Sequence, residues 1–339
     1  MGSAAVKVES IYEVPFLAHA AMEPMNCTVH VRDDGCEVWV GTQVLARAQA
    51  AVAKAAGLPL ENVVVHNHLI GGGFGRRLEI DGVARAVEIA KHVDGPVKVV
   101  WTREEDVQHD MYRPYWFDRM SAGLDEKGMP VARNHRFAGS SILARWLPPA
   151  FNNGLDPDST DGAINLAYAI PNMRVEYLRV EPAGIPTAFW RSVGPSHNVF
   201  VIESFIDELA AAAKQDAVAY RRALLDKAPR AKAVLELAAE KAAWGRPLPD
   251  RVGRGVSVQN TFRTYMAQVA EVEVAKDGSV RVRRVVCAVD CGIAIILDGR
   301  RAPQATVKVR AIPARSRCDS ILARRLTRAR LSPNSGATP

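Results

Sequence analysis

The sequence predicts an α+β fold in which mixed sheets pack against helices, followed by a basic tail without regular structure. Runs dense in β-branched residues recur from Val6 onward, and such runs are typical of strands. Three successive segments in the second half of the chain carry apolar residues at helical spacing. An Asp277-Gly278 turn then separates two β-rich runs, which predicts a hairpin.

The N-terminal part of the chain is expected to alternate strands with helices. The expected strands cover residues 6–13, 36–40, 61–70 and 97–101. Alanine dominates residues 44–57, where Gly57 is a typical helix end. Thr102 and the acidic residues after it favour another helix start.

The second half is expected to be mainly helical before it returns to strands. An Asp-Glu-Lys-Gly turn predicts a hairpin over 123–137, and the Pro, Asn, Asp and Gly content of 148–162 predicts a long surface loop. Helices are expected at 198–214, 216–225 and 230–244, and hairpin strands at 267–274 and 280–289. The acids Glu203, Asp207 and Glu208 are expected to be solvated or to pair helices.

The chain is expected to divide into a body and a tail. Residues 6–295 are interpreted as one domain, with a division into two subdomains near 150–165. Residues 296–339 contain ten Lys and Arg against two Asp and no Glu, without helical or alternating periodicity. They are either a natural basic tail or the product of a shifted reading frame in a high-GC gene. We favour the shifted frame because Arg, Ala, Pro and Ser dominate.

Charge and composition limit the classes of function. With 48% hydrophobic residues, the chain can bury a sizeable core. Outside the tail, 34 basic residues stand against 35 acidic ones, so the net charge of +7 gives no indication of nucleic acid binding. No apolar run reaches about 20 residues, so no membrane span is expected.

Cysteine and histidine usage argues against a metal site. The five cysteines are thinly spread, and Cys287 and Cys291 are spaced as CxxxC without a second ligand cluster, so neither zinc nor iron–sulfur ligation is expected. No HExxH-type pattern joins the remaining candidates, which are His19, Glu23, His66, His68 and Asp81. We therefore predict no metal-ligating residue.

The most informative motif is the glycine loop, Gly71-Gly72-Gly73-Phe74-Gly75-Arg76-Arg77. It follows an expected strand, where α/β sites commonly assemble, and its glycines let backbone amides approach a ligand. A helix over 78–93 would bury Val83, Val87 and Ile89 and point its N-terminus at an anion, while Arg76 and Arg77 would hold phosphate. The loop matches neither GxxxxGKS/T nor GxGxxG, and a tight turn between packed elements is the alternative interpretation.

Three further motifs give the sequence a family resemblance. They are His19-Ala20-Ala21-Met22-Glu23-Pro24, Trp39-Val40-Gly41-Thr42-Gln43, and Phe189-Trp190-Arg191-Ser192 with the apolar run after it. With the glycine loop, they resemble the molybdenum-binding large subunit of the xanthine dehydrogenase and aldehyde oxidase family. Trp190 points to the branch of the isoquinoline 1-oxidoreductase beta subunits and membrane-associated aldehyde dehydrogenases. The resemblance covers nearly all of residues 6–295 and implies the α+β fold of the molybdenum-binding domain.

The resemblance also implies a cofactor and the residues that bind it. The cofactor would be molybdopterin, in the cytosine dinucleotide form usual in bacteria, with the metal held by the pterin and not by the protein. Gln43 would place its amide near the metal's oxygen ligands, and the Phe74 ring would cover the site. The implied cofactor-binding residues are Gln43, Gly72, Gly73, Phe74, Gly75, Arg191 and Ser192.

Two departures from the family pattern concern catalysis and substrate. The family's catalytic base is a glutamate in a Gly-Val-Gly-Glu-like motif, which this sequence lacks, so the catalytic residue stays unknown. The glutamate of purine-specific members falls at Leu78 here, or one place off at Glu79, which argues against a purine substrate. We expect a fragment of the catalytic subunit that lacks both ends.

The reaction implied by the resemblance is hydroxylation of an aldehyde or an N-heteroaromatic carbon, with water as the oxygen source. A catalytically inactive remnant or assembly module is the alternative. Electrons would leave through a separate iron–sulfur small subunit, with a cytochrome as one candidate acceptor. The compartment is unknown, because the chain as given carries no address whereas exported full-length relatives work in the periplasm.

Overall fold

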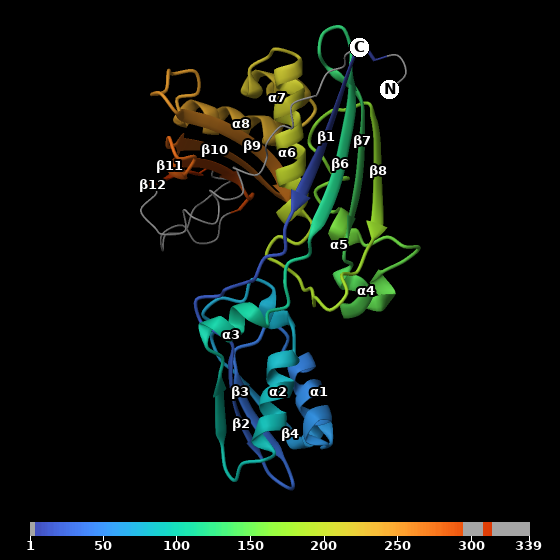
Figure 1. Ribbon diagram of the computed structural model, residues 1–339, viewed down its shortest axis with the longest axis vertical. Helices are drawn as coiled ribbons and strands as arrows, with labels where there is room; N and C mark the ends of the chain where they lie inside the picture. The colour runs from blue at the N-terminus through green and yellow to red at the C-terminus, as the bar shows by residue number, and fades with distance from the viewer. Residues whose placement is uncertain (1–3, 294–307, 314–339) are drawn as a thin grey trace.

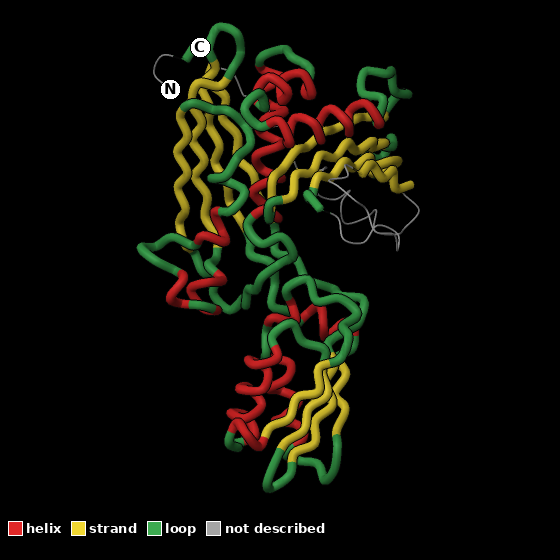
Figure 2. Tube along the Cα trace, turned by 180° about the vertical axis from the view of Figure 1, so that it is seen from behind, coloured by secondary structure: helices red, strands yellow, loops and turns green. Residues whose placement is uncertain are grey.

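The computed structural model describes residues 4–293 and 308–313. Its elements form two lobes, with β2, β3, β4, α1 and α2 in the lower lobe of Figure 1 and two further sheets with α6, α7 and α8 in the upper lobe. Seen from behind, loops make up most of the junction between the lobes (Figure 2). In the described part of the chain, no helix is long and apolar enough to cross a bilayer.

The lower lobe is a mixed four-stranded sheet in the order β4-β3-β2-β5. The strands are β2 (Asn26–Val31), β3 (Cys36–Val40), β4 (Val63–Asn67) and β5 (Val97–Val100), and β3 and β4 run parallel. The helices are α1 (Leu45–Ala56), α2 (Asp81–Ala90) and α3 (Arg103–Gln108). The predicted helix signals are confirmed, since Gly57 ends α1 at a φ of 73° and the Thr102 side chain accepts a hydrogen bond from the Glu105 amide.

The first sheet of the upper lobe has the order β1-β6-β7-β8. It contains β1 (Val6–Val14), β6 (Trp116–Leu124), β7 (Pro130–Gly139) and β8 (Asn172–Arg179), with β7 and β8 parallel and the other pairs antiparallel. Two short helices, α4 (Ile142–Trp146) and α5 (Pro157–Thr160), lie along the connection from β7 to β8. The predicted hairpin over 123–137 is therefore confirmed as β6 and β7.

The second upper sheet is antiparallel throughout, in the order β12-β11-β10-β9. Its strands are β9 (Val252–Thr261), β10 (Thr264–Val274), β11 (Val280–Asp290) and β12 (Lys308–Pro313). The helices before it are α6 (Pro195–Ala212), α7 (Ala217–Leu224) and α8 (Pro229–Lys241), of which α8 packs on the sheet. The tail was expected to lack regular structure, whereas its residues 308–313 form an edge strand; its other residues lie outside the described part.

The described part of the chain has two large hydrophobic cores, besides a small cluster of Ile142, Leu143 and Phe189. The larger core joins residues of β1, β6 and β7 to α6, α7, α8 and the β9–β11 sheet, and the second fills the lower lobe between its sheet and helices. The larger core contains residues on both sides of 150–165, the segment near which a division into two subdomains is predicted. The two large cores are separated where the chain enters the lower lobe after β1 and leaves it before β6.

Several other expectations differ from the structure. Residues 148–162 are not a plain surface loop, because α5 lies within them and its Ser159 and Thr160 are buried. The helix expected at 78–93 is confined to α2, and Ile89 is 46% exposed and not buried. Strands β2 and β8 were not predicted at all.

Glu203 on α6 is buried, and it pairs with another helix, the second of the two expectations for this acid. Its carboxylate lies 3.0 Å from the Arg221 Nε of α7 and accepts hydrogen bonds from the Tyr168 hydroxyl and the Val258 amide, both at 2.8 Å. Burial raises the pKa of Glu203, although the charge of Arg221 and these hydrogen bonds oppose that shift. The network ties α6 to α7 and β9.

Candidate functional site

The glycine loop lies at the carboxyl ends of the parallel strands β3 and β4. A 3₁₀ turn (Arg76–Leu78) closes it before α2 begins. Gly72 and Gly75 have φ values of 103° and 102°, and Phe74 has a φ of 55°. Glycine adopts such angles at no steric cost, whereas Phe74 is strained there, so the backbone path of the loop is maintained by its surroundings.

Gln43, in the turn after β3, lies directly over the glycine loop. Its Oε1 atom accepts a hydrogen bond of 3.3 Å from the Gly75 amide. A β-carbon on Gly73 would come within 2.4 Å of the same oxygen, so only glycine permits this approach. Oε1 already accepts the hydrogen bond from Gly75, and the Gln43 side chain is exposed. The NH₂ group of Gln43 is therefore the end available to donate to a ligand.

A second loop, residues 186–194 between β8 and α6, packs on the glycine loop. The Arg191 amide donates to the Phe74 carbonyl at 2.8 Å, and the Arg191 guanidinium lies 5.0 Å from the centroid of the Phe74 ring. A β-carbon on Gly75 would lie 1.8 Å from the Phe189 carbonyl oxygen. Ser192 is exposed at a φ of 80°. The structure therefore brings the two predicted loops into contact.

The face formed by these two loops is rich in hydrogen-bond donors. The amides of Gly72, Gly73 and Phe74 donate to no acceptor in the described part of the chain. Gln43 and Arg191 have exposed side chains that contact the glycine loop at the Gly75 amide and the Phe74 ring, whereas Gly72 and Phe74 are half-buried and Gly73 is buried. Successive unpaired amides and a cation make a surface suited to a ligand with ring carbonyls and phosphates.

The expectation that Arg76 and Arg77 hold phosphate is wrong. Arg76 is 5% exposed and engages both carboxylate oxygens of Asp81 at 2.7 and 2.8 Å. Arg77 is 1% exposed and donates to the carbonyls of Gly72 and Gly41. Asp81 also stands in the first turn of α2, so this helix terminus already faces a carboxylate. The two arginines therefore stabilise the glycine loop from the protein interior.

Four of the five residues considered for a metal site are engaged elsewhere, and the fifth, His68, is exposed. His66 stacks on Trp39, Glu23 accepts from the Gly71 amide at 2.6 Å, and Asp81 pairs with Arg76. His19 contacts Asp110. Within residues 4–293, no three histidine, cysteine or acidic side chains come together as a metal cluster.

Three charged residues that support the two loops were not singled out by the sequence for this role. Glu79, mentioned only for substrate choice, binds Arg145 at 2.7 and 2.9 Å, and Arg145 also donates to the Thr187 carbonyl at 3.0 Å. Asp110 lies 2.7 Å from the Arg76 Nε. These partners are far apart in sequence and follow no periodic spacing, so only the fold reveals them.

The family model of the molybdopterin cofactor-binding domain matches residues 1–225. That stretch contains Gln43, the glycine loop and Arg191. The chain belongs to the molybdenum-binding xanthine dehydrogenase and aldehyde oxidase family. The predicted family resemblance is thereby confirmed.

Curated relatives within this molybdenum-binding family cover most of the chain. The beta subunit of isoquinoline 1-oxidoreductase from Brevundimonas diminuta is 33% identical over 298 residues, which are 85% of this chain and 38% of that protein. A membrane-bound aldehyde dehydrogenase (pyrroloquinoline-quinone) from Gluconacetobacter polyoxogenes is 27% identical over 328 residues, 89% of this chain and 42% of that protein. The chain spans about two fifths of the length of these relatives.

Solved structures of two oxidoreductases share the fold of this chain. Quinoline 2-oxidoreductase from Pseudomonas putida 86 matches with a TM-score of 0.63 and 18% identity over 83% of this chain and 41% of that one. Aldehyde oxidoreductase from Desulfovibrio gigas matches with a TM-score of 0.59 and 20% identity over 83% of this chain and 33% of that one. The predicted combination of mixed sheets and packed helices is confirmed.

The residues at the two loops fit the family's molybdenum cofactor. Molybdopterin presents pterin and phosphate acceptors, and the face between Gln43 and Arg191 presents donors. Side chains at Gly73 or Gly75 would fill the space that the loops now share. Glu23, an acid beside the glycine loop, accepts hydrogen bonds from the Gly71 amide and from Asn26 and pairs with Arg77 at 3.1 Å, so its negative charge is compensated within the protein.

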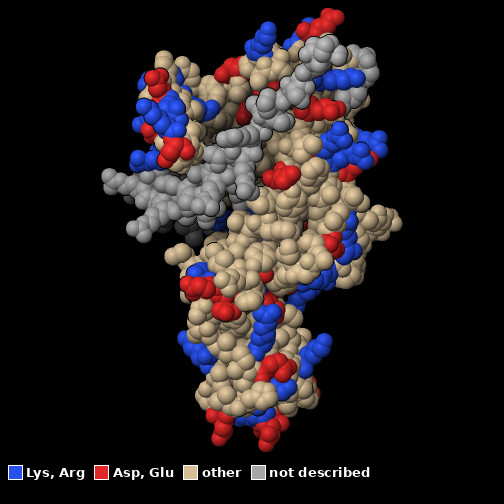
Figure 3. All heavy atoms as spheres, viewed as in Figure 1, with Lys and Arg blue, Asp and Glu red and all other residues tan. Residues whose placement is uncertain are grey.

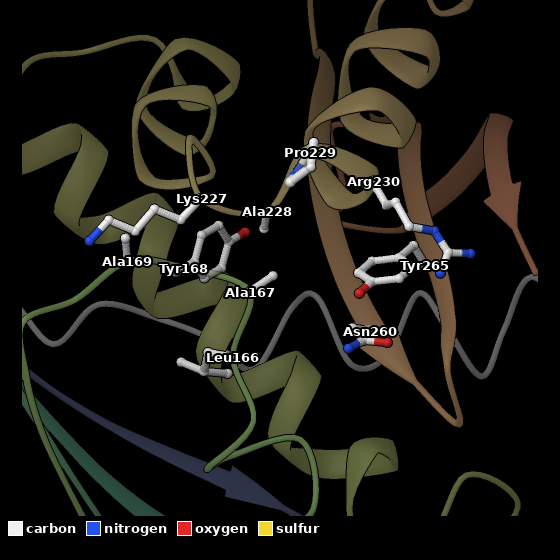
Figure 4. A pocket seen from close by; sticks show the side chains of 10 residues that line it. All are labelled: Leu166, Ala167, Tyr168, Ala169, Lys227, Ala228, Pro229, Arg230, Asn260 and Tyr265. Atoms are coloured by element: carbon white, nitrogen blue, oxygen red, sulfur yellow. The ribbon is translucent and has the colours of Figure 1, made fainter.

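A separate cavity lies in the upper lobe, away from the glycine loop. Its volume is about 470 Å³, and Figure 4 shows its lining by Tyr168, Lys227, Arg230, Asn260 and Tyr265 with smaller neighbours. The Arg230 guanidinium lies 4.6 Å from the centroid of the Tyr265 ring and binds Asp290 with two hydrogen bonds of 2.8 Å.

In Figure 3, charges of both signs are interspersed over the face shown, without a continuous basic stripe.

Proposed function

We propose that this chain binds molybdopterin in an oxidoreductase subunit that hydroxylates an aldehyde or an N-heteroaromatic carbon, with water as the oxygen source. The observation that carries the proposal is the donor-rich face that includes Gln43, Phe74 and Arg191. On it, the Arg191 guanidinium lies 5.0 Å from the centroid of the Phe74 ring. The names of the relatives, which include an isoquinoline oxidoreductase and an aldehyde dehydrogenase, support this substrate class.

Each residue of the face has a physical role in this proposal. When bound, the cofactor supplies the two-electron oxidation chemistry. The Gln43 NH₂ group donates to an oxygen of the cofactor, and a neutral donor does so without competing for a proton. The amides of Gly73 and Phe74 orient the cofactor, the Phe74 ring covers one side of it and limits water, and Arg191 with Ser192 contacts it from the second loop.

The cytosine dinucleotide form of the cofactor is the finer part of the proposal. It rests on the similarity to bacterial relatives. Mild acid hydrolysis of the purified, cofactor-loaded chain should release cytidine monophosphate. Release of guanosine monophosphate, or of no nucleotide, would contradict this form while leaving molybdopterin binding intact.

A separate iron–sulfur subunit is the proposed electron partner, and a cytochrome is a candidate later acceptor. The described cysteines support a separate carrier because Cys27 and Cys36 are buried in the lower core, while Cys287 and Cys291 lie in and after β11. Four thiolates close together would be needed for a cluster within the chain. Co-expression with a candidate iron–sulfur subunit, followed by co-purification, tests the pairing.

Turnover is tested with that complex in a dye-coupled assay on aldehydes and isoquinoline. The proposal expects oxidation that depends on molybdenum and that falls at least about tenfold when Gln43 is changed to Ala, since removing one such donor typically costs that much or more. Oxidation that persists in a molybdenum-free preparation would contradict it.

A second candidate is a chain that binds the cofactor without turnover. The Gly-Val-Gly-Glu-like motif, which supplies the base in the resemblance described above, does not occur within residues 1–339. Molybdenum bound to the complex without substrate oxidation would support this candidate over the first. A rate equal to that of an intact family member would reject it.

A further inference from the structure

His19 contacts the second loop of the candidate site directly and reaches the glycine loop through Asp110. It is 6% exposed, and its Nε2 atom is 2.8 Å from the Phe189 carbonyl oxygen. Because a carbonyl oxygen only accepts, Nε2 is the donor of this hydrogen bond. The Phe189 carbonyl is the group that excludes any side chain at Gly75. His19 therefore binds the atom at which the second loop meets the glycine loop.

The other nitrogen of His19 is anchored to the glycine loop through Asp110. His19 Nδ1 lies 3.0 Å from Asp110 Oδ2, and the His19 amide donates to the same oxygen at 2.5 Å. The second oxygen of Asp110 lies 2.7 Å from the Arg76 Nε of the glycine loop. A continuous chain of contacts thus runs from Arg76 through Asp110 and His19 to Phe189.

The Trp190 ring packs against the His19 ring in a tilted arrangement. The Trp190 ring centroid is 4.9 Å from that of His19, with an interplanar angle of 35°. On the other side of the junction, Arg145 ties Glu79 to the Thr187 carbonyl. Besides the direct hydrogen bond from the Arg191 amide to the Phe74 carbonyl, the second loop is thus held at two of its own carbonyls, those of Thr187 and Phe189.

We propose that His19 is a positioning residue that sets the spacing of the two cofactor-contacting loops, an inference that rests on the proposed cofactor binding. It touches no part of the donor-rich face itself. It acts through the Phe189 carbonyl, which fixes the loop whose next residues, Arg191 and Ser192, lie on that face. Loss of the Nε2 contact removes one of the hydrogen bonds that hold this loop and so loosens it, while the Asp110 contact and the core stay intact.

Two substitutions separate the contacts of His19. In His19→Gln the amide nitrogen can take the place of Nε2 and keep the hydrogen bond to Phe189. In His19→Asn the amide nitrogen can take the place of Nδ1 and keep only the contact with Asp110. His135→Asn is the matched control, because His135 is also fully buried and bonded to an aspartate, Asp118, at 2.7 Å, within the upper sheet.

Hydrogen exchange of the cofactor-free full chain, read by mass spectrometry over residues 186–194, measures the loop directly. The Ala188 and Arg191 amides are bonded to the Tyr112 and Phe74 carbonyls and report its release. We expect exchange about five- to tenfold faster in His19→Asn than in wild type. We expect His19→Gln to stay within about twofold of wild type, and His135→Asn to leave this peptide unchanged.

Equal rates in all four proteins, or the same acceleration in His19→Asn and His135→Asn, would overturn the role of His19. The proposed function is read separately from bound molybdenum. A wild-type chain that takes up no molybdenum defeats the proposed function, whereas the exchange rates still decide whether His19 holds the loop. Molybdenum content that falls in His19→Asn and recovers in His19→Gln supports both.

Discussion

The carbonyl oxygen of Phe189 occupies the space that a β-carbon on Gly75 would need, at a distance of 1.8 Å. Backbone cannot yield as a flexible side chain does, so Gly75→Ala must push the two loops apart. We expect this variant to lose about 2–4 kcal/mol of unfolding free energy, from overpacking and the left-handed backbone together. Urea unfolding followed by tryptophan fluorescence measures it.

Gly95→Ala is the control for that measurement. Gly95 has a φ of 99°, against 102° for Gly75, but nothing lies within 4 Å of its absent β-carbon. Backbone strain alone should cost about 1 kcal/mol there. Equal losses of unfolding free energy in the two variants would show that the contact with Phe189 does not affect stability.

The buried pair of Glu203 and Arg221 supplies a second prediction. Glu203→Ala leaves the fully buried Arg221 without its buried partner and should cost about 3–5 kcal/mol. Asp207 also pairs with Arg221, at 2.5 Å, but its side chain is 44% exposed, so Asp207→Asn should cost less than about 1 kcal/mol. Denaturant unfolding compares the two. A larger loss for Asp207→Asn would be contrary to this account.

Acid should weaken the contact between Asp290 and Arg230. The hydrogen bonds from Arg230 lower the pKa of Asp290 to about 2, below the value of about 3.9 for an unperturbed aspartate. A lowered pKa contributes stability that is present above about pH 4 and is lost as the pH falls toward 2. The stability difference between wild type and Asp290→Asn should therefore shrink over that range. Arg230→Gln is the control, and a difference that stays constant with pH would contradict the shift.

Thiol reactivity tests the lower core. Burial, with Cys36 nearby, raises the pKa of Cys27 to about 12, so its thiolate is scarce at pH 8. Cys27 is 1% exposed, whereas Cys291 is exposed. Peptide mapping after brief iodoacetamide treatment should find Cys291 alkylated at least about tenfold faster than Cys27. Similar rates, without prior unfolding, would be inconsistent with this core.

Local signals in the sequence were sufficient for much of the fold. Gly57 ends α1, and Asp216 caps α7 through its side chain, because a helix terminus is determined by neighbouring residues. The Asp277-Gly278 turn joins β10 and β11 as expected. Edge strands such as β8 escaped prediction because five of its eight residues are exposed and its apolar pattern is weak.

The candidate site was predictable in its parts but not in its supports. Motifs identified Gln43, the glycine loop and Arg191, and the fold brings them together. The phosphate-binding roles predicted for Arg76 and Arg77 were wrong. The sequence does not indicate that Arg76 pairs with Asp110 and that Arg77 donates to the Gly41 carbonyl. Long-range pairing decides whether an arginine beside a glycine loop faces a ligand or the interior.

The central claim is that the face around Gln43, Phe74 and Arg191 holds molybdopterin. The most direct test expresses the chain in a host that makes the cofactor and then measures the molybdenum and pterin content per chain. Wild type and Gly95→Ala should carry both in equal amounts, up to one per chain. Gly75→Ala should carry at least about tenfold less, because separated loops lose several aligned contacts at once. Metal-free and pterin-free wild type, or equal loading of Gly75→Ala, would contradict the claim.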